Sequence, residues 1–246
     1  MEWLVVCLLI VIAVLAGLLY LIIGIFRVSV LERRNHRHEE LEFLGKIGIS
    51  RQTVFFGDSI THYCPVEEMY AEYTQRSGLR VYNRGIASET SEDALRRLDG
   101  SVLALDPMNL VILLGCNDIG KKIPIAQTIR NIEEIITRTR KKNPGIHIIL
   151  QAVYPIREMG NSLPAKYLIG GRTCKKIRTL NKELKALAER QRVQFVDMTD
   201  LLAGEDGQLK QEYTMDGLHV NEQAYQKIAN RLISVLETGK EEEYAG

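Results

Sequence analysis

The longest apolar segment of the chain runs from Trp3 to Phe26 and contains no charged side chain. A helix rises about 1.5 Å per residue, so this segment is long enough to cross the roughly 30 Å hydrocarbon core of a bilayer. A cleavable signal peptide would have a basic start, a shorter apolar core and a small-residue cleavage site, whereas Glu2 precedes this run and bulky residues fill its end. The pattern therefore predicts a retained single-pass transmembrane helix over residues 1–26.

The stretch after the apolar run, residues 27–50, mixes charged side chains with spaced Val, Leu and Phe and predicts a helical juxtamembrane linker. No Lys or Arg precedes the run, and the basic residues that follow it are Arg27, Arg33, Arg34 and Arg37. Such an excess favours a cytoplasmic location for the rest of the chain, at the cell membrane. The extracellular orientation stays open, because long domains can be exported despite these charges.

Between residues 51 and 238, short β-rich runs alternate with longer amphipathic stretches, which is the pattern of a parallel sheet covered by helices. The central run is apolar throughout, as expected for a strand buried on both faces. The predicted strands are Thr53–Phe56, Arg80–Tyr82, Leu110–Leu114, His147–Ala152 and Gln194–Val196. The predicted helices are Glu67–Arg76, Ser91–Leu98, Ile125–Lys142, Cys174–Arg190 and Glu222–Leu236. Residues 154–171 form a long irregular connection of the kind that often shapes a pocket, and residues 239–246 an acidic tail.

Composition narrows the classes of protein that fit this pattern. The chain has 246 residues, 46% of them hydrophobic, which suffices for one well-buried core. The net charge is +1, and the Lys and Arg residues are scattered instead of forming a basic patch, so we expect no nucleic-acid partner. We expect neither a metal nor a cofactor, since the sequence has no ligand cluster and no Gly-rich nucleotide loop after a strand. The four cysteines, Cys7, Cys64, Cys116 and Cys174, are too widely spaced for a disulfide framework and favour reduced thiols.

Chemistry is expected beyond the carboxyl ends of the strands, where open parallel sheets bind their ligands. The first predicted strand ends in Gly57-Asp58-Ser59-Ile60, so Ser59 stands at a helix start whose free N–H groups suit a nucleophilic hydroxyl. Taken alone, the motif fits a helix cap better. The next two strands lead to Gly85 and Asn117. A backbone N–H at Gly85, the Asn117 amide and the Ser59 N–H would together form an oxyanion hole.

The last motif, Asp216-Gly217-Leu218-His219, precedes the final predicted helix. Asp216 can hold the Nδ1–H of the His219 ring while Nε2 faces a serine hydroxyl, which fixes the tautomer and orientation of the imidazole. His62 is a rival base, because it lies three residues after Ser59. It lacks an evident carboxylate to orient it, so we expect a pocket-lining or surface role for His62.

The four motifs together resemble the sequence blocks of the SGNH/GDSL hydrolase family. GDSI contains Ser59, a turn contains Gly85, GCND contains Asn117 and DGLH contains His219, in the family's order over residues 53 to 236. Ile60 stands where the family's nickname has Leu. The resemblance implies a three-layer α/β/α, flavodoxin-like domain with a five-stranded parallel sheet, the SGNH hydrolase fold.

The resemblance also implies ester hydrolysis through a covalent acyl-enzyme, with Ser59 as nucleophile, His219 as base and acid, and Asp216 as its orienter. The implied oxyanion hole consists of Ser59, Gly85 and Asn117. Three neighbouring residues are assigned supporting roles from their positions. We expect Asp58 and Asp118 to hydrogen-bond the strand-end loops, and Cys116 to be a small buried hydrophobe rather than a rival nucleophile.

The substrate is not determined by these motifs. Carboxylic esters with short acyl, O-acetyl or lysophospholipid-like groups all fit, so the expected partner is a small-molecule, lipid or glycan ester. An acyltransferase or a thioesterase would use the same triad, and a non-catalytic module could share the fold. Membrane attachment is expected through residues 3–26, and the oligomeric state stays open.

Overall fold

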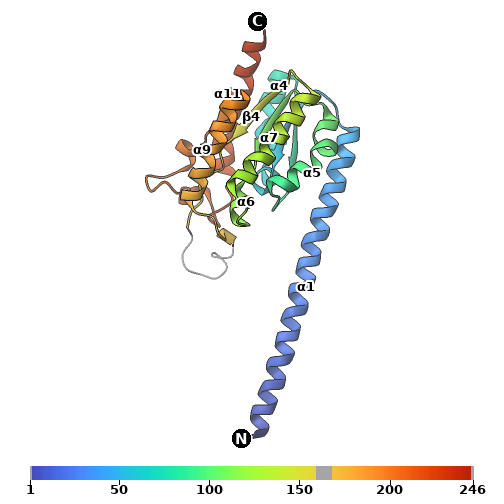
Figure 1. The fold of residues 1–246 in the computed structure, drawn as a ribbon, viewed down its shortest axis with the longest axis vertical. Helices are drawn as coiled ribbons and strands as arrows, with labels where there is room; N and C mark the ends of the chain where they lie inside the picture. Colours follow the sequence, from blue (N-terminus) through green and yellow to red (C-terminus); the bar gives the residue numbers. More distant parts are fainter. Residues whose placement is uncertain (1, 159–167, 245–246) are drawn as a thin grey trace. The chain divides into compact units, whose positions relative to one another are not determined.

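The structure is a computed structural model that describes residues 2–158 and 168–244, with side chains to residue 238. Figure 1 shows its helices and strands. The chain divides into two compact units, residues 1–40 and residues 41–246. The first unit is most of helix α1 (Glu2–Ile47), whose apolar part is fully exposed. Among the described residues, α1 is the helix long and apolar enough to cross a membrane, a property that it shares with signal sequences.

The last two turns of α1 belong to the second unit. Leu41 is fully buried there, and a Cβ on Gly45 would collide with the backbone oxygen of Gly100. The boundary between the two compact units therefore falls inside the predicted linker 27–50. The sequence pattern did not show this, because the spaced apolar residues of a linker and of a packed helix look alike.

The second unit contains a parallel sheet of five strands in the order β2-β1-β3-β4-β5. The strands are β1 (Thr53–Gly57), β2 (Val81–Gly85), β3 (Asn109–Leu113), β4 (His147–Gln151) and β5 (Gln194–Val196). Every residue of β1 and of β3 is buried, as the apolar runs predicted. All five predicted strands are confirmed, with ends that shift by at most three residues.

The sheet is covered by helices on both faces. One core lies between the sheet and α5 (Ser91–Ser101), α7 (Ile125–Lys142) and α9 (Cys174–Gln191). The other core lies against α3 (Val66–Met69), α4 (Ala71–Ser77) and α11 (Glu222–Tyr244). Among the described residues, short helices also lie near strand ends: α2 (Ser59–Tyr63), α6 (Cys116–Gly120) and α10 (Thr199–Leu202), with 3-10 turns at Leu103–Leu105 and Gln211–Tyr213. The predicted three-layer α/β/α fold is confirmed.

Of the predicted helices, two differ most from the observed bounds, and α5 and α9 extend by three residues and one residue beyond the predicted ends. The predicted helix Glu67–Arg76 is two short helices, because the backbone bends at Tyr70, which is buried together with Tyr73. Helix α11 continues to Tyr244 and so takes in most of the predicted tail 239–246. Glu and Lys are good helix formers, and their charge alone did not end the helix. Residues 159–167 of the predicted irregular connection lie outside the described residues.

Candidate active site

The site lies at the carboxyl edge of the sheet, where three neighbouring strands end together. Gly57, the last residue of β1, pairs with Gly85 on one side and with Leu113 on the other. The loops that follow these strands therefore leave the sheet at the same edge. They carry Ser59 and Asn117 within a few residues of the strand ends.

Ser59, His219 and Asp216 form one continuous chain of hydrogen bonds. The Ser59 hydroxyl lies 2.9 Å from His219 Nε2, although the two residues are 160 positions apart in the sequence. On the other side of the ring, Nδ1 lies 2.6 Å from Asp216 Oδ2. Ser59 is half-buried, and the His219 side chain is 27% exposed, so the hydroxyl faces a region that a small substrate can reach.

Asp216 is held in place by the turn that it begins. Its Oδ1 accepts hydrogen bonds of 2.8 Å from the backbone N–H groups of Leu218 and His219. Burial would raise the pKa of Asp216, but the hydrogen bonds from the His219 ring and from these N–H groups outweigh it and lower the pKa to about 2. Asp216 is therefore ionised at neutral pH and suited to hold the Nδ1–H of His219.

Asp58 supports the start of α2. It is 1% exposed, and its Oδ1 accepts the backbone N–H of Ile60 as a helix cap. Burial raises the pKa of Asp58 to about 6, against the opposing effects of the Ile60 N–H and of the charges of His219 and Arg172. The predicted supporting role is confirmed, and it places a carboxylate of raised pKa directly beside the serine.

Asn117 lies at the first turn of α6 and is 8% exposed. Its Nδ2 donates to the backbone oxygen of Glu89 at 2.9 Å, and its Oδ1 accepts from Arg172 Nη2 at 2.7 Å. Asp58 Oδ2 lies 3.5 Å from the same Nδ2, at the limit of hydrogen bonding. The amide of Asn117 thus has fixed partners on both of its ends.

Asp118 ties together the helices around the site. This fully buried carboxylate accepts from the backbone N–H and the hydroxyl of Ser91 and from the hydroxyl of Thr128. Ser91 begins α5 and Thr128 lies in the first turn of α7, so Asp118 joins both helices to α6. The predicted supporting role of Asp118 is confirmed by these contacts.

Gly85 makes a different contribution from the predicted one. Its N–H donates to Asn83 Oδ1 at 2.8 Å, and its oxygen lies 3.1 Å from Nδ1 of His62. A Cβ at this position would collide with the backbone of Thr61 and His62, so the glycine permits α2 to lie directly on β2. The predicted oxyanion role is not favoured, since the N–H of Gly85 already has a partner.

The loop after Gly85 contains a residue that sequence reasoning missed. Ser88 is exposed and has φ of +66°, a left-handed conformation that is uncommon for serine. It directly precedes Glu89, whose backbone oxygen holds the Asn117 amide. No sequence signal marks Ser88, because serine is common in turns and loops whatever their function.

His62 and Cys116 agree with the supporting roles expected of them. The half-buried His62 points its Nδ1 at the backbone oxygen of Gly85 and stacks edge-on against Tyr63. Cys116 is 4% exposed within the core, where burial raises the pKa of its thiol to about 12. Among the described residues no group of three His, Cys, Asp or Glu side chains is placed to hold a metal ion.

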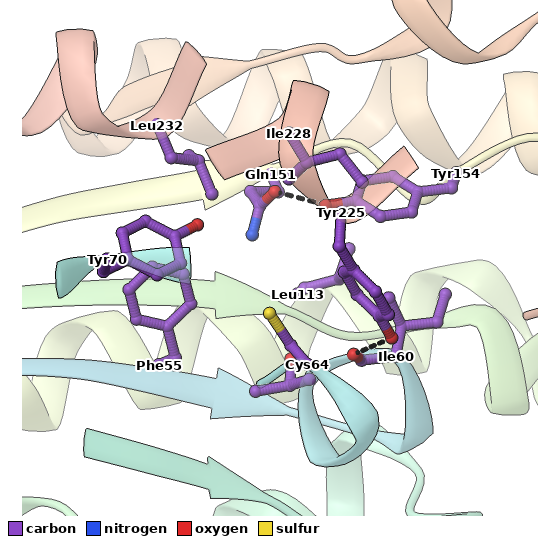
Figure 2. Close-up of a pocket in the computed structure, with 11 residues that line it drawn as sticks. Phe55, Ile60, Cys64, Tyr70, Leu113, Gln151, Tyr154, Tyr225, Ile228 and Leu232 are labelled. Carbon is purple, nitrogen blue, oxygen red and sulfur yellow. Dashed lines mark hydrogen bonds between the residues drawn. The ribbon is translucent and has the colours of Figure 1, made fainter. Parts of the chain in front are cut away.

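A small cavity lies beneath α2, between the sheet and α11. Figure 2 shows the aromatic side chains around it, with Tyr225 donating to the backbone oxygen of Ile60 and Tyr154 to Gln151. The space measures about 20 Å³, which is room for about one water molecule. This cavity is therefore too small to hold an acyl chain.

Large apolar side chains are exposed beside the triad. Among the described residues between 51 and 238, the exposed large hydrophobic side chains are Tyr63, at 56% exposure, and Met215, at 90%. The Tyr63 ring packs edge-on against the His219 ring, with centroids 5.6 Å apart, and Met215 directly precedes Asp216. Exposed apolar groups gathered at one place often mark a binding surface.

Comparison with known proteins gives consistent matches. Residues 55–227 match the GDSL-like lipase/acylhydrolase family. The chain is 26% identical over 207 residues to an isoamyl acetate-hydrolyzing esterase of Saccharomyces cerevisiae, covering 75% of this chain and 85% of the yeast protein. It superposes on a structure from Streptococcus pneumonia, described provisionally as a platelet activating factor, with a TM-score of 0.78 and 28% identity, covering 87% and 97% of the two chains. A GDSL-like lipase from Bacteroides thetaiotaomicron gives a TM-score of 0.65 and 26% identity, with 77% and 89% coverage.

The buried Asp58 predicts how stability depends on pH. Its folded pKa of about 6 lies above the ordinary value of 3.8, so the folded state favours the protonated acid. The contribution of Asp58 to the free energy of unfolding is fully present below pH 4 and is lost as the pH rises through 6. Asp58→Asn removes this loss. Between pH 4 and 6, the free energy of unfolding of the variant should therefore rise relative to that of the native chain, by at most about 3 kcal/mol.

Urea unfolding at a series of pH values measures this difference. Asp200→Asn is a control of opposite sign, because hydrogen bonds from Arg231 lower the pKa of Asp200 and its contribution is lost as the pH falls. Parallel stability curves for the native chain and Asp58→Asn would contradict the assignment of a raised pKa to Asp58.

Proposed function

The chain belongs to the GDSL-like lipase/acylhydrolase family and is a serine esterase, and from this premise we propose that it hydrolyses carboxylic esters through an acyl-enzyme on Ser59. The observation that carries the proposal is the chain of hydrogen bonds from the Ser59 hydroxyl through His219 to Asp216. A nucleophile, a base within hydrogen-bond reach and a carboxylate orienting that base are the parts that acyl transfer requires.

In the proposed reaction His219 Nε2 accepts the proton of the Ser59 hydroxyl while Oγ attacks the ester carbonyl. The tetrahedral intermediate collapses, the bond to the alcohol breaks, and His219 returns the proton to the departing alkoxide. Water then attacks the acyl-enzyme with the same base, which releases the carboxylic acid and restores Ser59. Asp216, ionised at neutral pH, stabilises the imidazolium that forms in each half of the cycle.

The proposed oxyanion hole consists of the Ser59 N–H, the Asn117 side-chain amide and a backbone N–H from the loop after β2. For that third donor we assign Ser88 in place of Gly85. The N–H of Gly85 is bonded to Asn83, whereas Ser88 lies in the exposed turn beside Glu89, the residue whose oxygen holds Asn117. Donors fixed before the reaction stabilise developing negative charge without reorganising.

For the substrate we propose a small ester with an apolar alcohol. His219 delivers a proton to the leaving oxygen, so groups packed against its ring border the alcohol side of the site. Tyr63 packs on that ring, and Met215 lies on the same turn as Asp216. The yeast relative is described as hydrolysing isoamyl acetate, an acetate of an apolar alcohol, and this description supports the same class. Acyltransfer and thioester cleavage would use the same triad, and no contact among the described residues favours them over hydrolysis.

We further propose that residues 3–26 anchor the catalytic unit in the cell membrane with that unit on the cytoplasmic side. The long apolar helix and the arginines that follow it support this orientation. A reporter fused after Gly246, active only in the cytoplasm, should therefore be active. Activity from a reporter that works only outside the cytoplasm would overturn the orientation and leave the chemistry unchanged.

Removal of the nucleophile tests the central proposal. Ser59→Ala should reduce hydrolysis of p-nitrophenyl acetate to near the uncatalysed rate, because no other hydroxyl occupies its place beside His219 Nε2 among the described contacts. His219→Ala should reduce the rate to a similar level, since serine and its base act as a unit. His62→Ala is the matched control and should keep most of the activity. A Ser59→Ala variant with native activity, or loss with His62→Ala but not with His219→Ala, would refute the assignment.

Two series of esters test the proposed alcohol side. With alkyl acetates from ethyl to pentyl, kcat/KM should rise by up to about fourfold per methylene, the gain expected from burying each group. The double substitution Tyr63→Ser and Met215→Ser should flatten this rise and leave ethyl acetate nearly unchanged. Ethyl esters of increasing acyl length are the control series and should respond little to the same substitutions. An equal response of both series would contradict the placement of the alcohol.

A further inference from the structure

Arg172 lies in the segment just before α9 and reaches across to the strand-end loop that carries Asn117. Its Nη2 donates to Asn117 Oδ1 at 2.7 Å and its Nε to the backbone oxygen of Cys116 at 3.0 Å. Its Nη1 donates at 3.1 Å to the backbone oxygens of Leu168 and Ile169. The guanidinium thus joins its own segment to the first turn of α6.

The position of this guanidinium is closely fitted. A Cβ on Gly120 would lie between 2.5 and 2.7 Å from three atoms of the Arg172 guanidinium, so a side chain at residue 120 would displace the group from this position. The hydrogen bonds of Arg172 in the described part of the chain go to neutral oxygens, and none of its described contacts is an ion pair with a carboxylate. Its positive charge also acts on Asp58, where it opposes the burial that raises the pKa of that carboxyl.

The bond to Arg172 decides which end of the Asn117 amide faces the site. An asparagine amide can turn over, since its oxygen and nitrogen differ little in shape. Guanidinium has only donors, so the amide oxygen must face Arg172 and the nitrogen must face Glu89 and the region around Asp58. One hydrogen of Nδ2 is bonded to Glu89, and the other has only a long contact of 3.5 Å with Asp58.

We propose that Arg172 is a positioning residue for ester hydrolysis, which holds the Asn117 amide with one N–H directed at the oxyanion and strengthens that N–H as a donor. The inference rests on the proposed function, because it assigns Asn117 to the oxyanion hole. A charged donor on the amide oxygen draws electron density from the nitrogen, and chains of hydrogen bonds reinforce one another in this way. Arg172 acts through Asn117, and it touches neither the ester nor Ser59.

A purely structural role for Arg172 has different consequences. If the residue only tied residues 168–171 to α6, its loss would lower the stability of the protein or change KM, with kcat retained in the folded fraction. Loss of an interaction that is made only in the transition state lowers kcat and leaves KM nearly unchanged. The split between kcat and KM therefore distinguishes the two roles.

The test uses the full chain with Arg172→Met. We expect kcat for p-nitrophenyl acetate to fall by about 10- to 100-fold with KM within about twofold, less than the roughly 100- to 1,000-fold expected for Asn117→Ala. In an Asn117→Ala background, Arg172→Met should lower kcat by less than about twofold more, because residues that act as a unit are not additive. Arg231→Met is the matched control: Arg231 is also half-buried and also bonds a backbone oxygen, but its partners are Asp197 and Asp200.

Chemical rescue by added guanidinium measures a change in kcat that a difference in folding alone would not produce. Millimolar guanidinium added to Arg172→Ala should restore part of kcat. It should not change kcat of the double variant Asn117→Ala/Arg172→Ala or of the native chain. If Arg172→Met does not fold, Arg172→Lys carries the same kinetic test, since a single ammonium cannot serve all four acceptors.

The outcomes separate the two levels of the proposal. Native kcat in Arg172→Met, a change confined to KM, or full additivity with Asn117→Ala would each overturn the role of Arg172. Ser59→Ala is measured beside them. If it abolishes hydrolysis while Arg172→Met is normal, only this inference fails, whereas activity in Ser59→Ala would remove the proposed function itself.

Discussion

The parallel pairing of β1 with β2 and β3, in register to the last residue, is the constraint on which the site depends. Gly57 pairs with Gly85 and Leu113, so the three loops that follow leave the sheet side by side. None of these loops contains His219, which lies in the turn before α11 and contacts the Ser59 hydroxyl across 160 positions of sequence. A shift of one residue in this register would turn every side chain of a strand to the other face, so the buried faces of β1 and β3 fix the site as firmly as they fix the fold.

The same edge of the sheet gathers buried acidic side chains, and each is held by local donors. Asp58 accepts an N–H of α2, Asp118 accepts three donors from α5 and α7, and Glu89 pairs with Arg97. Burying an unpaired charge would be costly, so these partners are a condition for placing carboxylates there. The arrangement also explains why Asp58 keeps a raised pKa while Asp216, more exposed and better supplied with donors, has a lowered one.

Much of the fold and the core of the site were predictable because each has a local signal. The five strands are short β-rich runs, and the motifs around Ser59 and His219 place specific residue types after strands. The bend at Tyr70 was not predictable, since two buried tyrosines interrupt a pattern that otherwise reads as one helix. The sequence signal at Gly85, predicted to be an oxyanion donor, was ambiguous in a similar way. A glycine signals close approach of a backbone, but the sequence does not say whether α2 or a ligand makes that approach.

Arg172 shows most clearly what a sequence leaves out. It lies 55 positions from Asn117, after a stretch without periodic pattern, and an arginine there looks like a solvated side chain. Only the fold brings it to the amide oxygen, and the glycine at residue 120 leaves space for its guanidinium in the observed position. An amide whose nitrogen is to face a ligand needs a donor-only partner on its oxygen. In this chain that partner comes from the segment before α9, so the orientation of the Asn117 amide depends on a residue outside all four motifs.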